Sequence, residues 1–159
     1  NKIFTIRYGK IETDYKENYT PKLLDIGSWE HLIEGDDIVV LSVGSMVNNA
    51  IKVAELLKDK KDINLGVINC RFIKPLDYTM LADIKERYKY IFTIEEGCIQ
   101  GGFGSSVLEY FSKFEYDNII NLIGVDDEFI EHGSRKELLE LTGLSVSRIY
   151  DKIIEVHEK

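Results

Sequence analysis

The chain has 159 residues, of which 44% are hydrophobic and 30% are charged, an ordinary globular composition with enough length for one domain and its own core. Acidic residues outnumber basic residues by 28 to 20, so the net charge is -8, and the lysines are scattered along the chain. This balance argues against a surface for nucleic acid or an anionic membrane, and no apolar run is long enough to span a bilayer.

The first twenty residues are typical of a segment that leads into a domain. The chain opens with NKIFTIRYGK, which has no Met and already shows a strand-like pattern. We interpret residues 1–20 as a linker from a preceding domain and residues 21–159 as the domain itself. An apolar run predicts a short strand near residues 23–26. Because no crossover helix separates this strand from the next, we expect it to join the sheet antiparallel.

The central part of the chain alternates buried strands with amphipathic helices. Three β-branched apolar runs predict strands, at residues 37–44, 63–72 and 90–94. Apolar residues at helical spacing predict a helix in each gap: Val47, Ile51, Ala54 and Leu57 in the first, and Leu81, Ile84 and Tyr88 in the second. The resulting order is βαβαβ, which favours parallel strands joined by crossover helices.

Three more elements are predicted towards the end of the chain. They are a helix over residues 103–114, a strand over 118–125 and a helix over 145–156. Taken together, the elements predict an α/β fold with three layers, α/β/α. Its mixed sheet has about five strands, mostly parallel with one antiparallel strand.

Five short phrases carry a resemblance to a known family. RYGK lies near the start, and VGSMVNNA, CRFIKPLD, TIEEGCIQGGFGSSVLE and FIEHGS follow at the carboxyl ends of predicted strands, where doubly wound folds place their ligand crevices. In this order and spacing they resemble the C-terminal domain of the transketolase superfamily of thiamine-diphosphate enzymes, and most of all the 1-deoxy-D-xylulose-5-phosphate synthases. The resemblance covers nearly the whole chain. Transketolases and the β subunits of 2-oxo-acid dehydrogenases share the architecture, so they remain alternatives.

The resemblance implies a function for a larger parent enzyme. The parent would be a thiamine-diphosphate-dependent transferase that joins pyruvate to glyceraldehyde 3-phosphate with loss of carbon dioxide, on the non-mevalonate route to isoprenoid precursors and towards thiamine. Thiamine diphosphate and Mg²⁺ would bind in the parent and not in this chain, which lacks the usual diphosphate and ylid-forming phrases. This chain would supply homodimer contacts and the wall of the active-site cleft, with no catalytic residue. A third alternative is a non-catalytic binding or regulatory module.

The resemblance also indicates candidate substrate contacts. In RYGK, Lys10 stands where the synthases have a second arginine that helps to hold the phosphate of glyceraldehyde 3-phosphate. A lysine can pair with phosphate as a point charge, without the two-pronged geometry of arginine. Arg7 of the same phrase and His132 of FIEHGS are weaker candidates, and a histidine beside a helix start more often packs than binds.

The phrase EEGCIQGGFGSS raises the question of what its glycines do. They lie at positions 97, 101, 102 and 104, which does not fit GxGxxG, and the P-loop lysine is missing, so we do not expect phosphate binding. We expect a sharp turn with an interface role, in which Phe103 makes an apolar contact and Ser105 or Ser106 caps the next helix. The residues assigned to this interface are Gly101, Gly102, Phe103, Gly104 and Ser105.

The two glutamates of the phrase are adjacent, so their side chains should diverge at a strand end and not act as an acid–base pair. One carboxylate should accept hydrogen bonds from loop N–H groups, and the other should meet solvent or Arg71. A salt link from Arg71 to Glu95 is a further hypothesis. Downstream, Ser134 and Glu137 have the spacing of a capping box.

Cysteine and histidine usage predicts no metal site and a reducing compartment. Cys70 and Cys98 form no CxxC pair and show no metal-ligand spacing with the three histidines. We expect Cys70 to be buried at a strand end and Cys98 to be the more accessible thiol. The expected location is the cytoplasm, or a plastid-like organelle if the source is a eukaryote.

Overall fold

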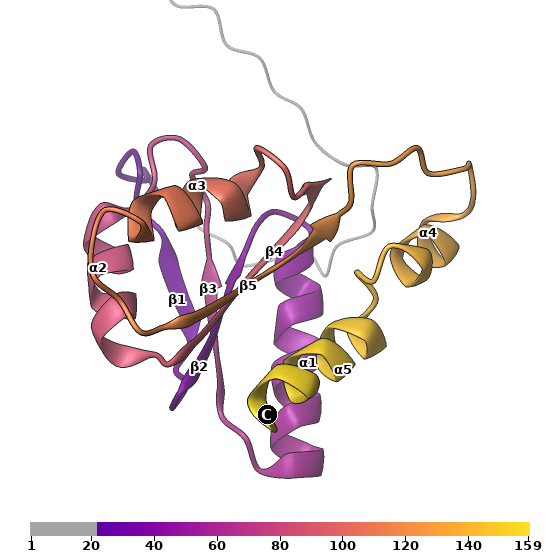
Figure 1. Cartoon of the computed structure of the whole chain (residues 1–159), viewed down its shortest axis with the longest axis horizontal. Coiled ribbons are helices and arrows are strands. Elements are labelled where there is room, and N and C mark those ends of the chain that lie inside the picture. Colours follow the sequence, from indigo (N-terminus) through magenta and orange to yellow (C-terminus); the bar gives the residue numbers. More distant parts are fainter. Residues whose placement is uncertain (1–21) are drawn as a thin grey trace, which may run out of the picture.

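The computed structural model describes residues 22–159, which form one five-stranded sheet with helices on both faces (Figure 1). The strands are β1 (Glu30–Ile33), β2 (Ile38–Ser42), β3 (Leu65–Asn69), β4 (Tyr90–Cys98) and β5 (Ile119–Val125). Their order across the sheet is β1-β3-β2-β4-β5. β1 pairs with β3 antiparallel, and all other pairs are parallel. The predicted three-layer fold with one antiparallel strand is therefore confirmed.

Three helices fill the crossovers that parallel strands require, and two more follow the last strand. They are α1 (Met46–Lys61), α2 (Tyr78–Arg87), α3 (Phe103–Phe111), α4 (Arg135–Leu141) and α5 (Val146–His157). α1 and α5 pack on one face of the sheet, and α2 and α3 pack on the other. α4 has no buried residue and stands beside the body of the domain (Figure 1).

Two apolar clusters, one on each face of the sheet, hold the layers together. β2 reads IVVLS and is buried along its whole length, so its side chains alternate between the two clusters. On the α2–α3 face, Trp29 packs edge-on against Phe103 with ring centroids 5.7 Å apart. Leu81, Ile84 and Tyr88 lie in the same cluster, as their helical spacing predicts.

The antiparallel strand lies later in the chain than the sequence pattern predicts. Residues 23–26 form no strand, and Leu23 and Ile26 are 103% and 81% exposed. β1 begins instead at Glu30, with His31 opposite Ile68 of β3. The prediction was wrong because β1 covers only one edge of the sheet, so its side chains alternate between exposed and half-buried positions and give no apolar run.

No helix among residues 22–159 is long and apolar enough to cross a membrane. The predicted linker, residues 1–20, lies outside the described residues, as do Arg7 and Lys10.

Candidate functional site

The four parallel strands end at the same edge of the sheet, which we call the carboxyl edge. β2 is followed there by Gly44 and Ser45, β4 ends in EEGC, and β5 leads into residues 126–134. The pairing of β4 with β5 shifts between Ile94 and Cys98, so the two glutamates lie in an irregular stretch of strand. Such irregularities redirect side chains, and here the two carboxylates go to different partners.

Glu95 closes the start of α3. Its side chain is only 7% exposed, and its two oxygens accept the backbone N–H groups of Phe103 and Gly104 at 3.0 and 2.9 Å. A carboxylate at this position satisfies two of the unpaired donors of the helix and complements the helix dipole. The expectation that one glutamate accepts backbone N–H groups is therefore confirmed, with the difference that the donors belong to the first turn of α3 and not to the loop.

The serines of GGFGSS do not cap α3, contrary to expectation. The N-cap is Gly102, which has no side chain to offer. Ser105 Oγ accepts the N–H of Gly101 at 3.1 Å and donates to the carbonyl of Ile99 at 2.6 Å, so it braces the turn. Ser106 lies inside the helix, and its hydroxyl donates to the carbonyl of Gly102. The serines are not caps because α3 begins at Phe103, so both of them lie inside the helix and not before it.

The glycine turn is shaped by close approach as well as by backbone conformation. Gly101 has a φ of +72°, in the left-handed region that favours glycine. Gly102 has an ordinary φ of -82°, but a Cβ there would lie 2.3 Å from the carbonyl oxygen of Cys98 and 2.6 Å from a Glu95 oxygen. Glycine is thus needed at 102 to let the turn fold onto the carboxylate.

The side chain of Phe103 is used inside the domain. It is 1% exposed and packs against Trp29, and Gly104 is buried beside it. Of the residues assigned to an interface, Gly101, Gly102 and Ser105 retain some surface. An interface role for the turn stays a prediction, and it rests on these three residues.

Glu96 joins three elements at the carboxyl edge. It accepts a hydrogen bond from the hydroxyl of Ser45, at the start of α1, and pairs with the guanidinium of Arg135, the first residue of α4. Both charged side chains are about two-fifths exposed, at 38% for Glu96 and 42% for Arg135. The sequence interpretation missed Ser45 and Arg135. The available signal was a cation at the start of a predicted helix, where it lacks a favourable dipole and benefits from an acidic partner.

Arg71 does not reach Glu95, so the proposed salt link is wrong. Its guanidinium donates to the hydroxyl of Ser28 at 3.2 Å and to the carbonyl of Trp29 at 3.1 Å, and it lies 3.5 Å from a carboxylate oxygen of Glu30. Arg71 therefore ties the β3–α2 loop to the segment that enters β1. The sheet order explains this, since β3 is the neighbour of β1 and β2 separates it from β4.

His132 lies exposed in the loop between β5 and α4. The capping box behind it is confirmed: Ser134 Oγ accepts the N–H of Glu137, and the Glu137 carboxylate accepts the N–H of Ser134 at 2.9 Å. The hydrogen bond from the Ser134 side chain lowers the pKa of Glu137 below its ordinary value. His132 as a substrate contact stays a prediction.

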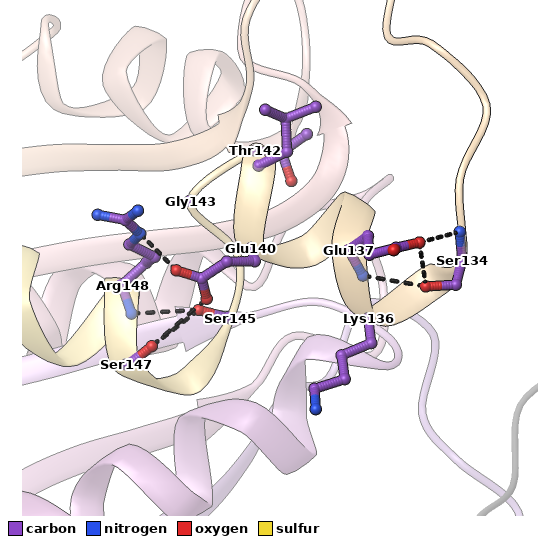
Figure 2. A pocket seen from close by; sticks show the side chains of 10 residues that line it. Ser134, Lys136, Glu137, Glu140, Thr142, Gly143, Ser145, Ser147 and Arg148 are labelled. Carbon is purple, nitrogen blue, oxygen red and sulfur yellow. Dashed lines mark hydrogen bonds and ion pairs between the residues drawn. The ribbon is translucent and has the colours of Figure 1, made fainter.

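A hollow of about 1280 Å³ lies between α4 and the start of α5. Figure 2 shows that its polar groups pair with one another: Ser134 with Glu137, and Glu140 with Arg148 at 2.7 Å. Lys136 points away from these pairs. A smaller hollow of about 380 Å³ has Glu96 and Arg135 among mostly apolar lining residues. Neither hollow presents a set of unpaired charges that would mark a ligand site.

Acidic, histidine and cysteine side chains are the residues that could hold Mg²⁺ or another metal ion. Within residues 22–159, no group of three or more His, Cys, Asp or Glu side chains is arranged to hold a metal ion. Cys70 is buried, as expected, and burial raises the pKa of its thiol well above the ordinary value. Cys98 is half-buried and is the more accessible of the two, also as expected.

A family match and individual relatives both connect this chain to the transketolase superfamily. The family described as the transketolase C-terminal domain matches residues 27–149. The 1-deoxy-D-xylulose-5-phosphate synthase of Geobacillus sp. (strain WCH70) is 46% identical over 133 residues, 83% of this chain and 21% of the relative. The synthase of Aquifex aeolicus (strain VF5) is 44% identical over 128 residues, 80% of this chain and 20% of the relative. The chain thus spans about a fifth of the length of these curated relatives.

Solved structures agree on the fold. A split-gene transketolase, described as an inactive β4 tetramer, superposes with a TM-score of 0.76 at 28% identity, over 88% of this chain and 45% of that chain. The transketolase of Campylobacter jejuni superposes with a TM-score of 0.62 at 18% identity, over 86% of this chain and 20% of that chain, which shows the fold alone. Because the family match covers most of the residues, the chain belongs to the transketolase C-terminal domain family.

Proposed function

We propose that this chain is the C-terminal domain of a 1-deoxy-D-xylulose-5-phosphate synthase. The parent enzyme would join pyruvate to glyceraldehyde 3-phosphate, releasing carbon dioxide and forming 1-deoxy-D-xylulose 5-phosphate. The observation that carries the proposal is the 46% identity to a synthase over 83% of the chain. The transketolase structures that share the fold are less similar in sequence, at 28% and 18% identity.

In this proposal the chain shapes the enzyme and does not perform the reaction. The described residues do not fit a Mg²⁺–diphosphate site, because Glu95 is committed to the start of α3 and Glu96 to Ser45 and Arg135. Thiamine diphosphate and Mg²⁺ are therefore assigned to the remaining domains of the parent, which would act as a cytoplasmic homodimer. The chain contributes interface contacts and the wall of the cleft, and Lys10 is the proposed contact for the acceptor phosphate.

The test is an assay of the full-length natural protein with pyruvate and glyceraldehyde 3-phosphate. Release of carbon dioxide together with 1-deoxy-D-xylulose 5-phosphate is expected. Transfer of a two-carbon unit between sugar phosphates, without use of pyruvate, would instead favour a transketolase, the second candidate, which the 0.76 TM-score supports. Acyl transfer from pyruvate to a lipoyl carrier would identify a dehydrogenase β subunit. A natural protein with none of these activities would be a binding or regulatory module.

A further inference from the structure

The loop between β5 and α4, residues 126–133, differs from the rest of the described surface. It reads DDEFIEHG, and its phenylalanine, Phe129, is fully exposed, at 107% of the reference area. Among residues 22–159, the hydrogen bond assigned to this loop joins the N–H of Glu128 to the carbonyl of Asp126, inside the loop itself. Within residues 22–159, the loop therefore has no hydrogen bond to the rest of its domain.

Other exposed aromatic residues of the domain have aromatic neighbours. Tyr78 stacks on Tyr110 with ring centroids 5.6 Å apart, and Phe114 lies 5.3 Å from the same ring. Phe114 is consequently only 50% exposed. Phe129 is paired with no aromatic ring in the described part of the chain, so a large apolar side chain stands free at the carboxyl edge. A single exposed apolar residue is common on protein surfaces, but aromatic side chains are enriched where proteins contact other surfaces.

Both ends of the loop are fixed, so its position is defined. At the first end, the carbonyl of Val125 accepts the N–H of Ile99 at 2.9 Å. At the second end, Arg135 is paired with Glu96, which also binds Ser45. The loop thus projects from the carboxyl edge between Val125 and Arg135, which are both tied to residues at the end of β4.

The loop has a marked charge. Four of its eight residues are acidic, namely Asp126, Asp127, Glu128 and Glu131, and it contains no lysine or arginine. A surface that receives Phe129 must therefore accept four carboxylates around it. Electrostatic complementarity requires lysines or arginines on the rim of that surface.

We propose that residues 126–133 are a docking loop that seats Phe129 in an apolar recess with a basic rim on the cofactor-carrying part of the parent enzyme. The inference rests on the proposed function, because this chain spans only about a fifth of the synthases that it resembles, and the rest of such an enzyme has to meet the domain. The carboxyl edge is the side of an α/β sheet that faces a ligand crevice, so the cofactor-carrying part is the expected neighbour.

Hydrogen exchange in the full-length natural protein tests the docking loop. Residues 115–117, an exposed stretch between α3 and β5, are the internal reference. If the loop docks, its amides should exchange at least about 10-fold more slowly than the reference. The variant Phe129→Ala should return the loop to fast exchange. The matched control Phe114→Ala, on the α3 side of the domain, should leave loop exchange slow.

Several outcomes would overturn the proposal. These are loop exchange as fast as that of residues 115–117, slow exchange that persists in Phe129→Ala, and protection that disappears on dilution, which would assign the loop to a contact between copies. The activity assay decides the proposed function separately. A protected loop in a protein that transfers two-carbon units would keep the docking loop and reject the synthase assignment. A synthase with a fast-exchanging loop would do the reverse.

Discussion

Glu95 and Glu96 show how neighbouring residues of one type take different roles. Their side chains leave the strand in different directions, one towards α3 and the other towards α1 and α4. Glu95 is buried and holds two backbone donors, whereas Glu96 is part of a half-exposed ion pair. Burial makes the difference, because a buried donor that loses its acceptor cannot turn to water.

Removal of the Glu95 carboxylate should therefore destabilise the domain strongly. Glu95→Ala leaves the N–H groups of Phe103 and Gly104 without acceptors, and we expect a loss of about 2–4 kcal/mol in the free energy of unfolding. Glu96→Ala is the matched control and should cost less than about 1 kcal/mol. Urea unfolding of both variants measures the difference. Equal losses would mean that Glu95 does not hold the helix start.

Lys10 is the residue proposed to reach the substrate. In the full-length enzyme, Lys10→Ala should raise the KM for glyceraldehyde 3-phosphate and leave pyruvate decarboxylation nearly intact. Loss of one charge-assisted hydrogen bond predicts a change of about 1.5–3 kcal/mol in kcat/KM for the acceptor. Steady-state kinetics with each substrate varied in turn gives the answer. An unchanged KM for the acceptor would rule out the contact.

At the scale of elements, the turn before α3 depends on close packing of its backbone against Cys98 and Glu95. If the turn served only as an interface, a substitution at Gly102 would weaken dimerisation of the parent enzyme more than folding. The structure instead places a Cβ at Gly102 against Cys98 and Glu95 of the same domain. Gly102→Val should therefore destabilise the domain itself, by about 1–3 kcal/mol or more. Gly101→Asn is the control, since asparagine tolerates a positive φ and no atom lies within 4 Å of a Cβ there.

Thermal unfolding of the separate chain distinguishes the two explanations for Gly102. If Gly102→Val lowers the unfolding midpoint and Gly101→Asn leaves it close to that of the unmodified chain, the effect of the substitution is on folding. If Gly102→Val folds normally but weakens assembly of the full-length enzyme, the turn is an interface element after all.

The start of α4 should respond to acid. Its capping box lowers the pKa of Glu137, so the folded state favours the charged carboxylate. This stabilisation is complete above the ordinary glutamate pKa of about 4.3 and is lost as the pH falls through the lowered value. The unfolding midpoints of the unmodified chain and of Glu137→Gln should therefore come closer together as the pH is lowered from about 6 to about 3. A constant difference would contradict the capping role, and Glu115→Gln, at an exposed loop position, controls for net charge.

At the scale of the whole molecule, the two apolar clusters make a complete core, so we expect residues 1–159 to fold cooperatively without the parent. We also expect this chain neither to bind thiamine diphosphate nor to decarboxylate pyruvate. Calorimetric titration with thiamine diphosphate and Mg²⁺ is the measurement. Binding tighter than about 100 μM, roughly -5.5 kcal/mol, would reveal a cofactor site that the assignment lacks.

The sequence predicted those features that local pattern determines. A run such as IVVLS has no stable place except inside a sheet, and Ser134 with Glu137 signals a helix start within four residues. Contacts between distant segments were out of reach. Glu96 and Arg135 are 39 residues apart in the chain. Arg71 lies near β1, and not near Glu95, because β3 is the neighbour of β1 in the sheet order, which the sequence pattern does not reveal. The antiparallel strand was predicted at the wrong residues because the apolar residues at 23–26 give a stronger strand pattern than the half-exposed β1.

β5 ends the sheet order, so within residues 22–159 one side of its backbone has no strand beside it. Its sequence, IINLIGV, contains neither a charged residue nor a proline, the features by which natural edge strands resist unwanted pairing. Ile119 is also 41% exposed at its start. When this domain is prepared apart from its parent, we expect self-association through β5 to limit its usable concentration before loss of the native fold does.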